Sequence, residues 1–225
     1  MNNQAPHYIG VDVQASDRGC PFVVLDGDGA PVASDWLTGD ATSRVAHIIR
    51  IANRFPNAPI GIDAPRKPLT SPRQWYWNGI HRRWRLRTTL ERGFGRHCEV
   101  VIAAHRLANP QWTPFREDAP PWMTLGFALF AGLEETTTYE VFPSASYTLL
   151  EDDASILAGL SLRGFSRGPK DMLDAYAAAL TIREFERGLG TAVGDGDSLG
   201  QIILPRKIKN PITPVLNWPS ARMEA

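Results

Sequence analysis

The first 63 residues alternate between apolar and polar positions in a pattern that predicts four strands and one helix. The segment 26–29 reads Asp-Gly-Asp-Gly and predicts a hairpin turn, because Asp-Gly steps supply the positive φ that tight turns need. Apolar residues at helical spacing within 45–52 predict a helix that Thr42 or Ser43 caps. The predicted strands, rich in β-branched residues and bounded by turn residues, are 8–13, 21–25, 31–37 and 60–63.

Later parts of the chain have less regular patterns. Four prolines within 110–121 predict a loop there, and 151–168 has the composition of a surface excursion. The first three strands, the helix after them and the fourth strand predict a topology of three antiparallel strands, a crossover helix and a fourth strand that returns parallel to the first. Further elements are expected as a helix over 123–133, a strand over 137–142, a short helix from Pro143 to about Leu150, a helix from Pro169 to about Arg187 and a strand over 200–204.

Composition narrows the class of protein only slightly. The chain has 24 Lys and Arg against 24 Asp and Glu, so its overall charge gives no argument for a polyanion partner. Two cysteines provide no disulfide framework and are typical of a reducing compartment. The first residues lack the pattern of a signal peptide, and no apolar run approaches the ~18 residues of a membrane span. We therefore expect a cytoplasmic protein without a membrane partner.

Two of the predicted strands, Ile9–Asp12 and Ile60–Asp63, share the order isoleucine, glycine, aliphatic residue, aspartate. Because side chains alternate along a strand, the glycine and the aspartate of each lie on one face of the sheet. If the strands are parallel neighbours, both aspartates lie at adjacent C-terminal strand ends, where open α/β sheets bind ligands. Crowded carboxylates repel each other, and a hard divalent cation between them relieves that repulsion.

A third acidic element opens the alanine-rich helix. Asp171 and Asp174 are three residues apart, so they share a helical face, and the alanines of 175–179 keep the helix thin enough to approach the strands. Oxygen ligands on rigid elements suit Mg²⁺ or Mn²⁺. We expect Asp12, Asp63, Asp171 and Asp174 to hold one or two such ions. The alternative for Asp171 is that it only complements the helix dipole.

Three other positions carry chemistry that the sequence alone leaves open. Glu140 is either a further catalytic ligand or the structural partner of an arginine. Cys98 lies in the run Arg96-x-Cys98-Glu99, whose role is unknown, and without a clear base partner we expect it to be a buried thiol rather than a nucleophile. Asp195-Gly196-Asp197 predicts a hairpin turn, because the rest of a calcium loop is missing.

The segment 66–96 concentrates positive charge, with nine Lys and Arg against one glutamate, so the rest of the chain is net acidic. Arginines beside tryptophans can hold phosphates while the rings stack on bases, which would make this segment a nucleic-acid-binding surface. The alternative is a solvated helix face whose aromatic side chains pack into the core. The candidate substrate-binding residues are Arg82, Arg83, Trp84, Arg85 and Arg96.

Five segments follow one another along nearly the whole chain: Ile9–Asp12, Ile60–Pro65, Arg96–Glu99, Tyr139–Pro143 and Lys170–Leu180. In this order they resemble domain-of-unknown-function family 429, a group of predicted nucleases with a ribonuclease H-like fold. The wider ribonuclease H-like superfamily has an aspartate at the end of its first strand, a carboxylate on the neighbouring fourth strand, and one or two carboxylates near the start of its last helix. The resemblance implies that Asp12, Asp63, and Asp171 with Asp174 are the site residues.

We therefore expect a single ribonuclease H-like α/β domain over 1–225, with a mixed sheet and helices on both faces. In it, 66–98 would be a basic aromatic insertion and 205–225 an irregular tail. The expected activity is that of a metal-dependent nuclease or phosphodiesterase on DNA, RNA or a small phosphodiester. One alternative is a phosphotransferase of the actin and sugar-kinase type, although 13–16 lacks the glycines of its phosphate hairpin. Another is a non-catalytic nucleic-acid-binding or scaffold protein.

Overall fold

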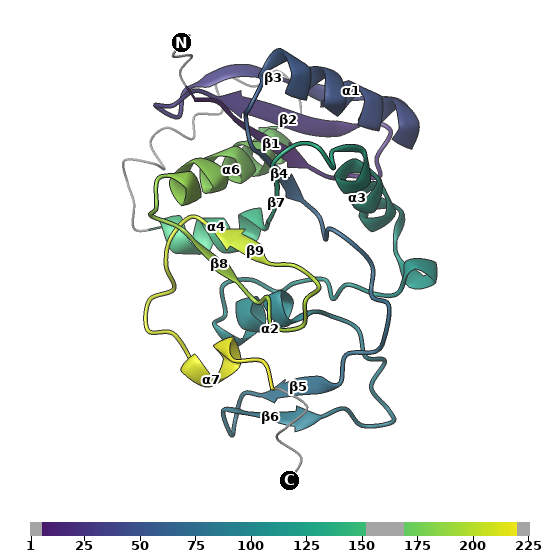
Figure 1. Cartoon of the computed structure of the whole chain (residues 1–225), viewed down its shortest axis with the longest axis vertical. Helices are drawn as coiled ribbons and strands as arrows, with labels where there is room; N and C mark the ends of the chain where they lie inside the picture. Colours follow the sequence, from purple (N-terminus) through teal and green to yellow (C-terminus); the bar gives the residue numbers. More distant parts are fainter. Residues whose placement is uncertain (1–5, 152–168, 220–225) are drawn as a thin grey trace.

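The computed structural model describes residues 6–151 and 169–219, which form a mixed α/β fold around a seven-stranded sheet (Figure 1). The strands of this sheet are β1 (Tyr8–Asp12), β2 (Cys20–Leu25), β3 (Pro31–Leu37), β4 (Ile60–Asp63), β7 (Thr138–Val141), β8 (Thr191–Val193) and β9 (Ile202–Leu204). The helices are α1 (Ala41–Arg54), α2 (His97–Ala104), α3 (Pro121–Gly132), α4 (Pro143–Leu150), α6 (Pro169–Glu186) and α7 (Thr213–Leu216), with a 3₁₀ turn at Arg116–Asp118. Apart from Glu151, the predicted surface excursion at 151–168 lies outside the described residues.

The strands lie in the order β3-β2-β1-β4-β7-β9-β8. The first three pair antiparallel, and β1, β4, β7 and β9 pair in parallel. This confirms the predicted meander, crossover helix and return of the fourth strand beside the first. The carboxylate of Asp26 closes the β2–β3 turn by accepting hydrogen bonds from the backbone N–H groups of Asp28 (3.0 Å) and Ala30 (2.9 Å). Asp40, rather than Thr42 or Ser43, caps α1.

Helices cover both faces of the sheet, as the sequence predicted (Figure 1). On one face, Ile9 and Val11 of β1 form a core with residues of α1 and α3 such as Ile48 and Leu129. On the other face, α6 packs against the centre of the sheet and α4 lies beside it, with a core that includes Val23. The central strands are therefore buried on both sides, and ligands can reach them only at their ends.

The two strand glycines bring α6 into direct contact with the sheet. A Cβ atom on Gly10 would lie 2.0 Å from the carbonyl oxygen of Ala175 and 2.3 Å from the backbone nitrogen of Ala179. A Cβ atom on Gly61 would lie 2.5 Å from Cδ1 of Ile182. Because glycine and aspartate share a strand face, the contact that seats α6 also places the first turns of α6 toward the aspartates of β1 and β4.

A second group of elements lies beyond the sheet, at the bottom of Figure 1. It contains α2, α7 and a separate hairpin of β5 (Trp75–Asn78) and β6 (Arg83–Leu86). None of these elements, nor β8, was predicted, because each is short and lacks a regular apolar period; tertiary contacts stabilise them. The tail from 205 is thus not wholly irregular. No helix formed by the described residues combines the length and apolar character needed to cross a bilayer.

Candidate carboxylate site at the strand ends

The two strand-end aspartates are direct neighbours. In the parallel pairing of β1 with β4, Asp12 lies opposite Asp63, just as Gly10 lies opposite Gly61. Both aspartates stand at the C-terminal ends of central parallel strands, the edge at which open α/β sheets bind ligands. Asp12 and Asp63 therefore lie side by side, as the sequence predicted.

Asp12 is buried, with 8% of its surface exposed, and has one side-chain hydrogen-bond partner among the described residues. The amide Nε2 of Gln14 donates a 2.6 Å hydrogen bond to its Oδ2. The pKa of Asp12 is raised to about 6, mainly by burial; the charges of Asp174 and Asp171 contribute to this rise, and the hydrogen bond from Gln14 opposes it. The other two predicted carboxylates are thus close enough to act on Asp12 electrostatically.

Asp63 borders a cavity of about 490 Å³ that also reaches Gln14 and Trp122. Burial raises the pKa of Asp63 well above its usual range, and the charges of Asp12 and Asp174 add to the effect. The negative charge of either carboxylate therefore opposes ionisation of the other. A cation placed between these carboxylates would remove that opposition.

Asp174 and Asp171 lie in the first turns of α6 and are partly exposed. The hydroxyl of Tyr147 donates to Oδ1 of Asp174, and the ammonium of Lys170 donates to Oδ2, both at 2.9 Å. Asp171 forms no hydrogen bond or ion pair with a described residue, and it acts on Asp12 through its charge. The role of Asp171 as a ligand stays a prediction beside the helix-dipole alternative.

The donor set at the strand ends fits a hard divalent ion, because it consists of carboxylate oxygens on rigid elements. Within residues 6–151 and 169–219, however, no three His, Cys, Asp or Glu side chains converge in the arrangement that would hold a metal. Tyr147 and Lys170 engage the two oxygens of Asp174, and Gln14 engages Asp12. Coordination would therefore require at least Asp174 to exchange the Lys170 ammonium for the ion.

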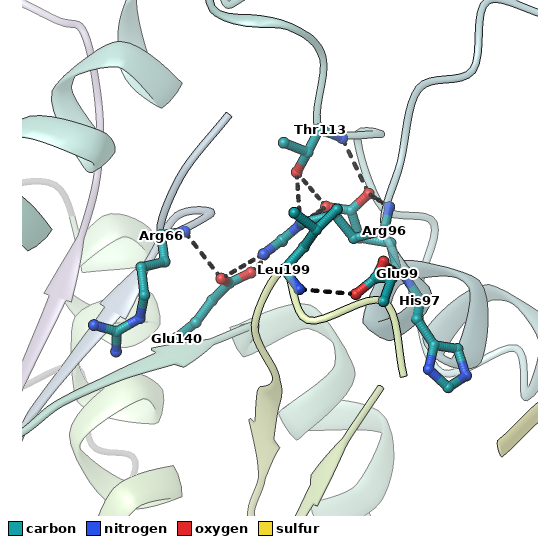
Figure 2. A network of polar contacts seen from close by, with 8 residues as sticks. Arg66, Arg96, His97, Glu99, Thr113, Glu140 and Leu199 are labelled. Carbon is teal, nitrogen blue, oxygen red and sulfur yellow. Dashed lines mark hydrogen bonds and ion pairs between the residues drawn. The ribbon is translucent and has the colours of Figure 1, made fainter. Parts of the chain in front are cut away.

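Glu140 lies one strand further along the sheet, on β7, and belongs to a buried network with Arg96 (Figure 2). Both of its carboxylate oxygens accept hydrogen bonds from Arg96, through Nη1 at 2.8 Å and through Nη2. One of them also accepts from the backbone N–H of Arg66 at 3.0 Å. This favours the structural alternative for Glu140, since its oxygens are already engaged, although its charge adds to the raised pKa of Asp63.

Arg96 joins this network to α2. Its side chain is 1% exposed and also donates to Glu99, which in turn accepts from the backbone N–H of Thr113 at 3.0 Å. Arg96 was predicted from the sequence to bind substrate, but its buried guanidinium already donates hydrogen bonds to two carboxylates, which favours a structural role. Cys98 is fully buried, and burial raises the pKa of its thiol, as expected of a structural cysteine rather than a nucleophile.

The basic hairpin divides into exposed and engaged side chains. Arg82 and Arg83 are exposed, whereas both terminal nitrogens of Arg85 pair with Glu91, at 2.5 and 2.8 Å. Trp84 donates through Nε1 to the carbonyl oxygens of Pro214 and Asn217, and its ring contacts Trp77, His97 and Trp218. These contacts agree with the packing alternative for Trp84, since its partly buried ring fixes the C-terminal segment, but the expected helix face is wrong: the segment is a β-hairpin.

Three side chains at the site, those of Tyr147, Arg44 and Gln14, had no role in the sequence analysis. Tyr147 comes from α4, and nothing in its local pattern indicates that it reaches Asp174. Arg44 of α1 donates to the carbonyl oxygens of Gln14 and Ser16, each at 2.8 Å, and fixes the loop that follows Asp12. Gln14 is polar and lies two positions after Asp12, which is the local indication in the sequence that its side chain can contact Asp12.

The Asp195–Asp197 segment connects β8 with the antiparallel β9, as the predicted hairpin turn requires. Asp197 accepts a 2.6 Å hydrogen bond from the backbone N–H of His97 at the start of α2, so it anchors this helix. Comparison with known proteins adds no further assignment: no protein family, no curated protein and no solved structure matches this chain significantly.

Proposed function

We propose that this protein is a metal-dependent nuclease or phosphodiesterase with a ribonuclease H-like arrangement, as its resemblance to domain-of-unknown-function family 429 implies. The observation that carries the proposal is the direct pairing of Asp12 with Asp63 at the ends of two central parallel strands. The close contact of α6 with Gly10 and Gly61, which brings Asp174 toward them, supports it.

The energetics of the pair support a functional role. A buried carboxylate such as Asp12 beside a second, partly buried one such as Asp63 destabilises a fold unless a proton or a cation neutralises the pair. The raised pKa values of Asp12 and Asp63 express that cost in the absence of a cation. Strongly perturbed carboxylates beside a cavity are a frequent property of active sites, where a bound ion recovers the cost.

Asp12 and Asp63 would hold the ion or ions, with Asp174 as a third ligand from α6. When bound, a divalent ion would supply a stabilising charge for the phosphoryl oxygens and a more acidic water. Gln14 orients Asp12, and Tyr147 fixes one oxygen of Asp174. The cavity of about 490 Å³ next to Asp63 falls in the range of small-ligand sites and can receive the phosphodiester.

The experiment combines Mn²⁺ titration by calorimetry with hydrolysis of bis(p-nitrophenyl) phosphate and of labelled DNA and RNA oligomers. We expect the wild type to bind Mn²⁺ and to cleave at least one substrate, and Asp63→Asn to lose both properties. Asp28→Asn is the matched control, because Asp28 is an exposed aspartate of the β2–β3 turn.

Unchanged Mn²⁺ affinity in Asp63→Asn would contradict the proposal. Mn²⁺ binding without hydrolysis of any substrate would favour the non-catalytic alternative. Hydrolysis or transfer that requires ATP would instead favour the phosphotransferase.

A further inference from the structure

A wide cleft lies apart from the strand-end carboxylates. It has a volume of about 1660 Å³ and is bordered by the β5–β6 hairpin, the C-terminal parts of α2 and α4, and the segment 206–212. None of the carboxylates of the candidate metal site lines it. Its walls come from five segments of the chain (73–82, 100–112, 148–151, 188–189 and 206–212), so no local motif indicates it.

Positive charge is concentrated in this cleft. Six basic side chains line it against one carboxylate, Glu151, although the whole chain has zero net charge. A low-dielectric cleft with one sign of charge focuses the potential and attracts ligands of the opposite sign. The basic residues are Arg73, Arg82, Arg106, Arg206, Lys207 and Lys209.

Several of these cations are not committed to carboxylates. Arg82, Arg106 and Lys207 form no ion pair with any residue in the described ranges, and all three are exposed. Arg82 and Arg106 also have positive φ angles, 46° and 56°, in turns where glycine would be less strained. The arginine side chains therefore offer these turns no conformational advantage, and their charge is free for a ligand.

Arg73 is an unusual member of the wall. Its guanidinium lies over the rings of Tyr76, at 4.1 Å from the centroid, and of Trp112, at 5.0 Å. Its Nε and Nη1 atoms are inaccessible to solvent and have no hydrogen-bond partner among the described residues. Tyr76, Trp77 and the 39% exposed Trp112 add aromatic surface to the same cleft. Cations interleaved with aromatic rings are the pattern of grooves that bind single-stranded nucleic acid.

We infer that this cleft binds a single strand of DNA or RNA, with Arg82, Arg106 and Lys207 on its phosphates and Trp112 against a base. The inference replaces the hairpin surface predicted from sequence, because Arg85 and Trp84 are engaged within the protein. It does not depend on hydrolysis at the carboxylate site. If that site is active as proposed, the cleft supplies the binding surface for its nucleic-acid substrate.

The test measures fluorescence anisotropy of labelled 12-mers of oligo(dT) and oligo(U) with the whole protein in EDTA. The triple variant Arg82→Ala, Arg106→Ala, Lys207→Ala should bind at least tenfold more weakly at 50 mM salt. Its log–log salt slope should be smaller in magnitude by about 2, since each phosphate contact on a single strand contributes about 0.7. The control Arg18→Ala, Arg50→Ala, Arg54→Ala removes three exposed arginines outside the cleft and should leave both quantities unchanged.

A second variant keeps the result interpretable. Trp112→Leu retains apolar bulk but removes the stacking surface, and it should weaken binding roughly 5- to 100-fold, while a thermal melt reports the integrity of the fold. Equal losses in the cleft and control triple variants, no binding to either oligomer, or tighter binding to a duplex would each overturn the inference. Asp63→Asn should bind as the wild type does, so failure of the cleft and failure of the proposed hydrolysis give different results.

Discussion

Replacing Asp12 by asparagine isolates the cost of a buried charge at the strand ends. Asparagine keeps the shape of the side chain, and its Oδ1 can still accept the hydrogen bond that Gln14 donates to Asp12. The ordinary pKa of an aspartate is 3.8, and in the folded protein burial raises the pKa of Asp12 to about 6. The folded state therefore binds this proton more tightly than the unfolded state does.

The sign of the pH dependence follows from that difference. Below pH 3.8 both states are protonated and Asp12 imposes no electrostatic cost; between pH 3.8 and about 6 the cost grows, and above pH 6 it is complete. A pKa raised by this amount corresponds to about 3 kcal/mol of lost stability at neutral pH. Asp12→Asn should recover up to that amount in metal-free protein, which for a chain of this size is a rise of roughly 6–12 °C in Tm.

The assay is urea or thermal denaturation in EDTA at pH 4.5 and at pH 7.5. The variant should gain most at pH 7.5 and much less at pH 4.5, where Asp12 is largely protonated. Asp28→Asn serves as the control, since this aspartate is exposed in a turn and its replacement should produce no such pH-dependent gain. A loss of stability at pH 7.5 in Asp12→Asn, or an equal gain at both pH values, would refute the electrostatic reasoning.

Two other predictions concern packing. Gly10→Ala places a Cβ atom 2.0 Å from the carbonyl oxygen of Ala175, so α6 must move. We expect overpacking to lower the free energy of unfolding by roughly 1–3 kcal/mol or more, and calorimetry to show weaker Mn²⁺ binding. The control Gly79→Ala, whose Cβ would lie 4.0 Å from its nearest neighbour, should change neither quantity. Glu140→Gln removes one of the two buried carboxylates that pair with Arg96 and should lower the free energy of unfolding by roughly 3–5 kcal/mol, measured by urea denaturation. An unchanged denaturation midpoint would contradict a structural role for the pair.

The sequence contained enough local information for the central part of the fold. Alternation in β1 to β4, the Asp-Gly turn and the apolar spacing in α1 depend on residues close together in the chain, and the structure has these elements in the predicted order. The repeated order of glycine and aspartate also placed Asp12 beside Asp63, because a strand fixes the face of each residue by its position alone. The predicted course of α6 was right for the same reason, since its apolar and alanine residues are contiguous.

The tertiary structure alone decided the partners of the charged residues. Glu140 meets Arg96 rather than a metal, and the ring of Trp84 meets the edge of Trp218 rather than a base, because of segments tens of residues away. Arg85 pairs with Glu91 through the local geometry of the hairpin, which no periodic pattern indicates. The same holds for the large cleft, whose cations come from the hairpin, from α2 and from the segment 206–212. Periodicity records which face of an element is buried, whereas the contact across that face depends on how distant elements pack, which no local pattern encodes.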